Sequence, residues 1–293
     1  MSIVRSTNSY LFGLIRSRLG QQSLEINKLE EQAITGRKIN RPSDAPAEMV
    51  QVNRLREELA NQDVYDTNSQ WATSLLGLVD QTLEEVTNLG KRASEIAVQM
   101  TSEHYNDVDR AAAATEVGAL RGQVLILANS ELGGRYLFSG DAYDAAAFDS
   151  AGTYQGSSDT PEILVGEERW VQSGWDGSDV FQGSVDSFQV LEDLETALNA
   201  NDPDAVFALL DDLEEVTEQA ISWRQEAGWE YNNADDALAL SESLRTELAG
   251  HLSSAVDANI AEVYLQLEEA RNSYSAALQV AAGGMGDSLF DVL

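Results

Sequence analysis

Apolar residues recur at alternating spacings of three and four positions near both ends of the chain. Residues three and four apart share one face of a helix, and a narrow apolar stripe of this kind is typical of helices that pair. A chain with such a stripe at each end is expected to pair its termini with each other or with neighbouring copies. The stripes comprise Ile15, Leu19, Gln22, Ile26, Leu29 and Ala33 at one end, and Ile260, Val263, Leu267, Ala270, Tyr274, Ala277 and Ala281 at the other.

The same rhythm predicts helices through most of the chain, at 2–35, 45–102, about 108–132, 187–200, from Asp202 toward Gly228, and about 234–282. Gly36 supplies a left-handed stop for the first helix. A turn with Pro42 follows, in which Asp44 is the expected N-cap and Pro46 fits the first turn of the next helix.

Between residues 135 and 183 the chain is rich in glycine, aromatic residues and short apolar runs, which predicts a small β-rich insert. The predicted fold class is mainly α, an elongated antiparallel helical rod or coiled coil formed by the N- and C-terminal helices, with a β-rich inserted domain. The expected parts are terminal coiled-coil assembly arms at 1–40 and 250–293, a helical rod domain at 41–140 and 187–249, and an outer insert at 141–186.

The net charge of −32 is concentrated in one half of the chain. Residues 1–140 hold 14 Lys and Arg against 18 Asp and Glu, whereas residues 141–293 hold 4 against 32. Such acidity opposes binding to nucleic acid and to anionic membranes. The chain has no cysteine, and no run of apolar residues approaches the length of a membrane span. The N-terminus is a poor secretory signal, because Arg16 and Arg18 interrupt its short apolar patch.

Nothing in the sequence indicates catalysis. His104 and His251 are far apart among polar residues, and the many acidic clusters lack the spacing of a calcium loop. Trp170, Trp175 and Phe181 are candidates for a sugar pocket, but we interpret them as the core of the insert. We therefore predict no catalytic residue, no cofactor and no metal ligand.

Four segments together resemble the flagellin superfamily, which includes filament flagellins and the junction proteins between hook and filament. They are Gly36–Pro46 (GRKINRPSDAP), Ala128–Gly140 with the step GRYLFSG, Arg224–Gly228 (RQEAG) followed by Asn232-Asn233, and the ending Ser288–Leu293 (SLFDVL). The resemblance covers most of the chain outside residues 141–186. Pro42, Pro46 and the YLFSG step are more typical of the junction proteins than of flagellins, although Ala45 stands where the superfamily often has a second acidic residue.

The resemblance implies a non-enzymatic, extracellular subunit of the bacterial flagellum, exported by the flagellar type III route without a cleaved signal peptide. Its implied partners are other copies of itself, hook-associated protein 1, flagellin, the export apparatus and an export chaperone, with no nucleic acid and no membrane insertion. Each arm alone cannot bury its stripe, so we expect it to fold on assembly. The expected interface comprises Ile15, Leu19, Ile26, Leu29, Ile260, Val263, Leu267, Ala270, Tyr274, Ala277, Leu289 and Phe290, next to a structural turn at Gly36, Pro42, Asp44 and Pro46.

Three hypotheses about function remain open. The chain is either a junction protein or a filament subunit of the flagellin type, and position along the flagellum separates the two. A third hypothesis is a carbohydrate-binding or enzymatic surface protein that uses the insert 141–186 as its working part.

Overall fold

Two long helices, α2 (Pro46–Met100) and α7 (Leu210–Val256), each contribute to both compact units of the chain. The computed structural model describes the backbone of residues 2–290 and the side chains of residue 10 and residues 13–282. The first unit comprises Met1–Ala60 and Thr246–Leu293, and the second comprises Asn61–Arg245.

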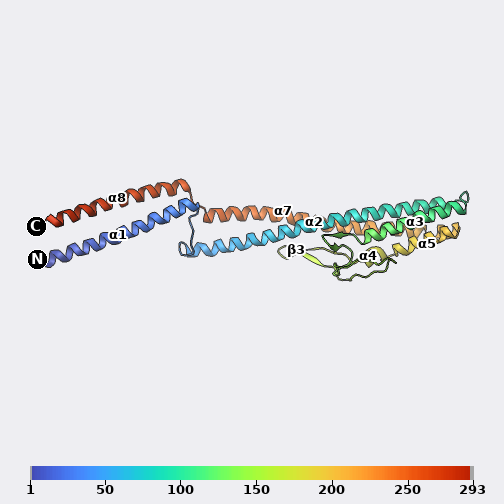
Figure 1. Ribbon diagram of the computed structural model, residues 1–293. Coiled ribbons are helices and arrows are strands. Elements are labelled where there is room, and N and C mark those ends of the chain that lie inside the picture. The colour runs from blue at the N-terminus through green and yellow to red at the C-terminus, as the bar shows by residue number, and fades with distance from the viewer. Residues whose placement is uncertain (1, 291–293) are drawn as a thin grey trace. The chain divides into compact units, whose positions relative to one another are not determined.

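The remaining elements are mostly helical. The helices are α1 (Ser2–Thr35), α3 (Asp107–Ala128), α4 (Gly177–Gln182), α5 (Ser187–Asn199), α6 (Pro203–Ala208) and α8 (Ile260–Phe290). Two antiparallel hairpins lie between α3 and α4, one of β1 (Glu131–Leu132) with β2 (Arg135–Tyr136) and one of β3 (Glu162–Gly166) with β4 (Arg169–Gln172). The predicted fold class, mainly α with a small β-containing insert, is confirmed, and the terminal helices α1 and α8 pair with each other (Figure 1).

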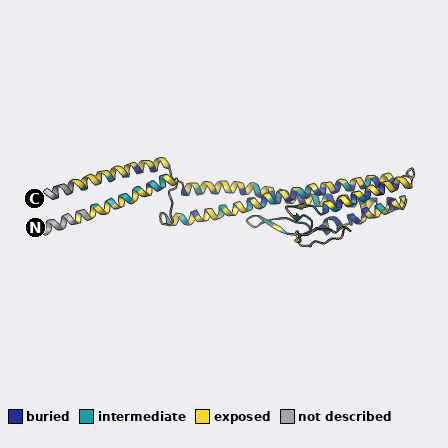
Figure 2. Ribbon diagram, viewed as in Figure 1, coloured by how far each residue is buried: buried dark blue, intermediate teal, exposed yellow. Residues whose placement is uncertain are grey.

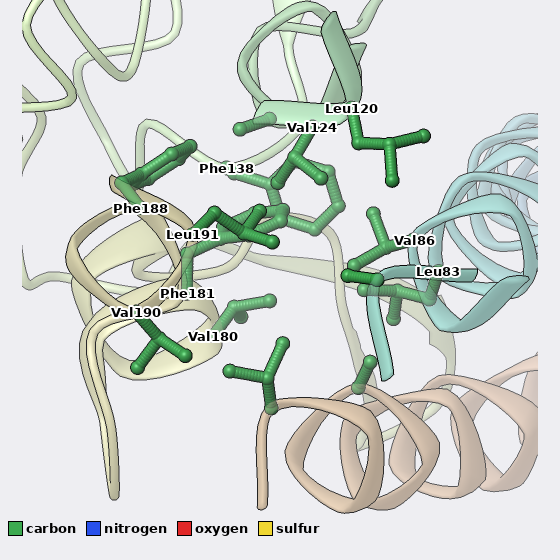
Figure 3. Close-up of a cluster of buried hydrophobic side chains, with 14 of the residues drawn as sticks. Leu83, Val86, Leu120, Val124, Phe138, Val180, Phe181, Phe188, Val190 and Leu191 are labelled. Atoms are coloured by element: carbon green, nitrogen blue, oxygen red, sulfur yellow. The ribbon is translucent and has the colours of Figure 1, made fainter. Parts of the chain in front are cut away.

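The second unit has its own hydrophobic core, in which helices α2, α3 and α5 bury one apolar face each. Phe138, Phe181 and Phe188 lie together in this core (Figure 3), and Phe148 packs against Phe181 and Phe188. Their ring centroids are 5.0–6.0 Å apart, and the Phe138 and Phe181 rings meet edge to face. Aromatic pairs in this geometry add to the free energy gained by burying their area.

Arginines of α7 hold this helix against α2 in the second unit. Arg224 binds the carboxylates of Asp80 at 2.6 Å and Glu84 at 3.0 Å, and Arg245 binds Asp66 at 3.1 Å. The two helices therefore run antiparallel, because higher numbers on α7 meet lower numbers on α2. Only Asp66 of these acids is buried, so we expect the other pairs to contribute little to stability.

The β3–β4 hairpin buries Val165 and Val171 in the core and also makes polar contacts with the helices. The side-chain amide of Asn68 on α2 donates a 2.7 Å hydrogen bond to the Leu164 carbonyl oxygen. Trp175 and Phe181 are buried in the core, as we interpreted them, but Trp170 is 55% exposed and does not belong to that core. Among the described residues, the insert therefore brings no group of aromatic residues together around a sugar-sized pocket.

Several predicted helix ends were wrong. The third helix ends at Ala128 rather than at residue 132, because the chain turns there into the β1–β2 hairpin. The helix expected to stop at Gly228 continues to Val256 as α7, because Ala227 and Ala234 on either side of the glycine are buried against the core. The interruption falls instead at residues 257–259, before α8.

Helix α3 is the one described helix that is long and apolar enough to cross a membrane by length and composition alone. This is weak evidence, because the core helix of a soluble domain passes the same test. In the second unit α3 packs against α5 and buries Ala113, Val117 and Val124 in the shared core. We therefore interpret α3 as a core helix.

Glu230 on α7 is a buried acid beside the β3–β4 hairpin. Its carboxylate oxygen Oε2 has no hydrogen-bond partner among the described residues. Burial raises the pKa of Glu230, and the charges of Glu226 and Glu162 raise it further. Hydrogen bonds from the Gln172 backbone and the Asn233 side chain oppose this shift. At neutral pH the ionised form therefore costs free energy in the folded state.

We predict that Glu230→Gln raises the melting temperature of the second unit at neutral pH. A pKa raised by folding contributes stability that is fully present below the unfolded-state pKa and is lost as pH rises through the folded-state pKa. The advantage of the glutamine variant should therefore shrink toward zero as the pH falls below about 4. Calorimetry at neutral pH and below about pH 4 measures this difference, with the exposed Glu214→Gln on the same helix as the matched control. A melting temperature that falls at neutral pH would contradict the prediction.

Candidate assembly surface: the terminal helix pair and its clasp

Helices α1 and α8 lie antiparallel in the first unit and meet along the predicted apolar seam (Figure 1). The contact buries three side chains, Leu29, Val263 and Leu267. Ile26 and Ala270 are partly buried beside them. Because helix stability in proteins comes mostly from packing, so small a core gives helices of 34 and 31 residues little support.

The other predicted interface residues lie less deeply. Half-buried positions are Ile15, Leu19, Tyr274 and Ala277. Ile260, at the start of α8, is 44% exposed. Leu289 and Phe290 lie outside the residues whose side chains the structure describes. The structure therefore brings together the part of the seam nearest to the helix ends at Thr35 and Ile260.

The same two helices also expose apolar side chains that were not among the predicted interface residues. Figure 2 shows how much of α1 and α8 is exposed. These residues lie off the three-and-four rhythm of the seam, which is why that rhythm did not select them. They are Tyr10, Leu14, Leu24 and Ile34 on α1, and Tyr264, Leu265, Leu278 and Val280 on α8. The pair thus presents apolar surface on more than one face.

A short backbone clasp joins the end of α1 to the segment that leads into α8. We use the term clasp for residues 36–38 and 256–258. The Lys38 N–H donates to the Val256 carbonyl oxygen at 2.8 Å, and the Ala258 N–H donates to the Gly36 carbonyl oxygen at 2.8 Å. Arg37 and Asp257 form the antiparallel bridge between these two bonds. Gly36 ends α1 with φ of +69°, a left-handed conformation that glycine adopts without steric cost.

In the loop after the clasp, Asp44 does not have the N-cap role that the sequence predicted. The carboxylate does not cap α2; its Oδ2 accepts hydrogen bonds from the backbone N–H groups of Arg41 at 2.8 Å and Asn40 at 3.2 Å. Ala45 occupies the N-cap position, because its carbonyl oxygen accepts the Met49 N–H. Pro46 is the first residue of α2, where its missing N–H costs nothing. Asp44 thus closes the preceding turn rather than opening the helix.

Ion pairs at the helix pair are exposed. Arg271 of α8 binds Glu30 of α1 at 2.6 Å, and Arg41 binds Glu31 at 3.2 Å. The hydrogen bond that Arg271 donates to Glu30 raises the pKa of Arg271, so the guanidinium stays charged at all ordinary pH values. Exposed pairs of this kind contribute little free energy, so they set register more than stability.

The described residues contain no group of three His, Asp or Glu side chains that could hold a metal ion. The exposed His251 lies 3.5 Å from Glu247 on the same helix. The clasp and the helix pair are built from apolar side chains and backbone hydrogen bonds.

Residues 9–142 match the family model of the bacterial flagellin N-terminal helical region. Flagellar hook-associated protein 3 from Salmonella typhimurium is 32% identical over 61% of this chain, and that from Escherichia coli is 33% identical over 63%. The chain spans 57% of the length of each of these two relatives. Polar flagellin F from Vibrio parahaemolyticus is 29% identical over 60% of the chain and 45% of its own length.

The solved structure of FlgL from Xanthomonas campestris has the same fold, with a TM-score of 0.62 and 20% identity over 68% of this chain and 99% of that one. These matches show that the chain is similar to proteins of the flagellin superfamily over part of its length. Within it, the predicted resemblance to flagellar hook-associated protein 3 is confirmed.

We predict that Asp44→Ala loosens the turn after the clasp. The variant leaves the N–H groups of Arg41 and Asn40 without their carboxylate acceptor, which costs about 1.4 kcal/mol. Amide hydrogen exchange at these two positions should then be roughly tenfold faster. Asp44→Asn keeps an acceptor oxygen and serves as the matched control. Unchanged exchange in the alanine variant would show that the carboxylate does not hold the turn.

Proposed function

We propose that this chain is a structural subunit of the bacterial flagellum, which acts as an adaptor between the hook, at hook-associated protein 1, and the flagellin filament. The observation that carries this proposal is the pairing of α1 and α8 over a core of three buried side chains. Two helices that expose Leu14, Leu265 and Val280 need further helices to cover them. Each Leu or Val that becomes fully buried in an assembly contributes roughly 1.5–3 kcal/mol.

Copies of the same chain are the first partners of this surface. The interface we propose follows the seam residues from Ile15 to Leu29 and from Ile260 to Ala277, with Leu289 and Phe290 continuing it. The terminal segments 1–40 and 250–293 then act as assembly arms, residues 41–140 and 187–249 as the helical body, and the insert 141–186 as the outer part. The clasp fixes which arm residues face each other, so one register is presented to neighbours.

The remaining parts of the proposal concern partners and location. Flagellin on one side and hook-associated protein 1 on the other are the expected neighbours in an extracellular assembly. Export by the flagellar type III apparatus, with an export chaperone, completes the proposal. We also propose that the chain performs no catalysis, because the site is built from apolar contacts and its relatives carry the names of flagellar hook and filament proteins.

A flagellin-type filament subunit is the second candidate. It is favoured by the match of residues 9–142 to the flagellin N-terminal region and by the 29% identity to polar flagellin F. The higher identity to hook-associated protein 3, over a larger share of the relative, supports the junction role instead.

Immunoelectron microscopy of intact flagella separates these candidates. With an antibody against residues 141–186, we expect label at one spot, where hook meets filament. Flagella from a strain that lacks the gene provide the control for non-specific label. Label along the whole filament would make the chain a flagellin, and flagella without label would contradict both candidates.

We predict that the arms gain helix when the chain assembles, because α1 and α8 bury too little apolar surface to be stable alone. Circular dichroism at 222 nm should show more helix per residue in the assembly than in the dilute monomer. The variant Val263→Asp/Leu267→Asp removes two of the three buried seam residues. In the buffer in which the unmodified chain assembles, its signal at 222 nm should stay at the value of the monomer. Equal helix content in monomer and assembly would contradict this prediction.

A further inference from the structure

One pocket in the first unit is lined by two arginines that form no ion pair, unlike other arginines near them in the sequence. We call it the arginine pocket; it is lined by Arg37 and Arg56 on an apolar wall of Ala249, Leu252 and Val256. Ser253 and Asp257 complete the lining. All of these residues belong to the first unit, so the pocket is defined within one compact body.

The two guanidinium groups have no carboxylate partner among the side chains that the structure describes, since no such oxygen lies within 4.0 Å. By contrast, Arg41 and Arg54 bind Glu31 and Glu58, each at 3.2 Å. Both pocket arginines are exposed. In a chain with 50 acidic residues against 18 basic ones, two arginines without an ion pair thus share one concave site with a single carboxylate, that of Asp257.

The clasp fixes the backbone that carries one of these cations. Arg37 lies between the two clasp hydrogen bonds, opposite Asp257. The Asp257 carboxylate accepts the Ser253 hydroxyl at 2.5 Å. Guanidinium groups are weakly hydrated and bind carboxylates in a bidentate manner, so a site of this kind favours an acidic protein segment that also brings apolar atoms for the wall.

The second unit of the same chain has the complementary charge. It holds 8 Lys and Arg against 36 Asp and Glu, whereas the first unit holds 10 against 14. Most acids near its arginines are already paired, such as Asp80 with Arg224 and Glu116 with Arg92. The start of α7 is the densest run without an ion pair among the described residues, with Asp211, Asp212, Glu214, Glu215 and Glu218.

We propose that the arginine pocket of one copy binds the acidic start of α7, residues 211–218, of a second copy. This contact rests on the proposed function, because it joins copies of the chain within the flagellar assembly. It adds a polar contact between the first unit of one copy and the second unit of its neighbour, in addition to the apolar contacts of the arms. The contact also relieves the repulsion among five carboxylates that have no cation of their own.

A peptide of residues 208–220, labelled with a fluorophore, tests the pocket without requiring assembly. The protein is the full chain with its seam intact, kept below the concentration at which it assembles. We expect saturable binding that weakens at high salt, and at least a tenfold loss of affinity in Arg37→Glu/Arg56→Glu. The matched control Arg41→Glu/Arg54→Glu changes the net charge equally and should keep the affinity within about twofold. Circular dichroism confirms that the variants keep the same helix content.

Three results of this binding experiment would overturn the proposal. They are no binding to the chain with both pocket arginines, equal binding to the Arg37→Glu/Arg56→Glu variant, and equal binding of a scrambled peptide of the same composition. The last result would mean that the pocket attracts any acidic chain rather than the start of α7.

Charge exchange in the full-length assembling chain provides the second test. Arg37→Glu/Arg56→Glu should raise the concentration needed for assembly at least tenfold at moderate salt, and adding Asp211→Arg/Glu214→Arg should restore most of the loss. Assembly that is unchanged by the first variant, or not restored by the second, overturns this contact while the arms-based function stands. Failure of the junction proposal is recognised separately, by the position of the antibody label on flagella.

Discussion

The antiparallel clasp is the constraint on which the terminal helix pair depends. Its two backbone hydrogen bonds join segments that lie 216 or more positions apart along the chain, and the Lys38 ammonium adds a third bond to the Ser254 carbonyl oxygen at 3.0 Å. Both α1 and α8 are directly continuous with these segments. The clasp therefore decides which residues of α1 oppose which residues of α8, and a slip by one position would rotate Leu29 away from Val263.

Burial is divided unequally between the two units, and this division fits the different tasks that we propose for them. The second unit buries a continuous core from Ala72 to Ala237, with tight aromatic contacts around Phe181. The first unit buries a cluster of three side chains and leaves Tyr264, Leu265 and Ile34 exposed. A unit with a large hydrophobic core of its own suits a body with a fixed shape. A unit with a small core suits a part that gains its stability from neighbours.

The sequence predicted what depends on local periodicity. The local spacing of apolar residues was enough to predict most long helices. It also predicted the seam from Ile26 to Leu29 and from Val263 to Ala270. Helix ends were less predictable, because tertiary contacts override local signals. Gly228 looked like a stop, but buried alanines on both sides keep α7 continuous through it.

The clasp and the arginine pocket could not be predicted, because both are made by residues that are distant in sequence. Asp44 was recognised as a residue of the turn, but its role depends on which backbone N–H groups the fold brings within 3.2 Å of its carboxylate. Arg37 and Arg56 are ordinary exposed arginines in the sequence. Only the approach of α7 at Leu252 and Val256 gives them a shared concave site.

The charge distribution acts together with this division of burial. In the assembly that we propose, the second unit carries a net charge of −28 and its copies repel one another at low salt, so the apolar faces of the arms and the arginine pocket together must overcome that repulsion. The first unit, at −4, adds almost no repulsion where the arms meet. In that proposed assembly, acidic bodies would keep unassembled chains apart, whereas nearly neutral arms would allow them to join once they are aligned.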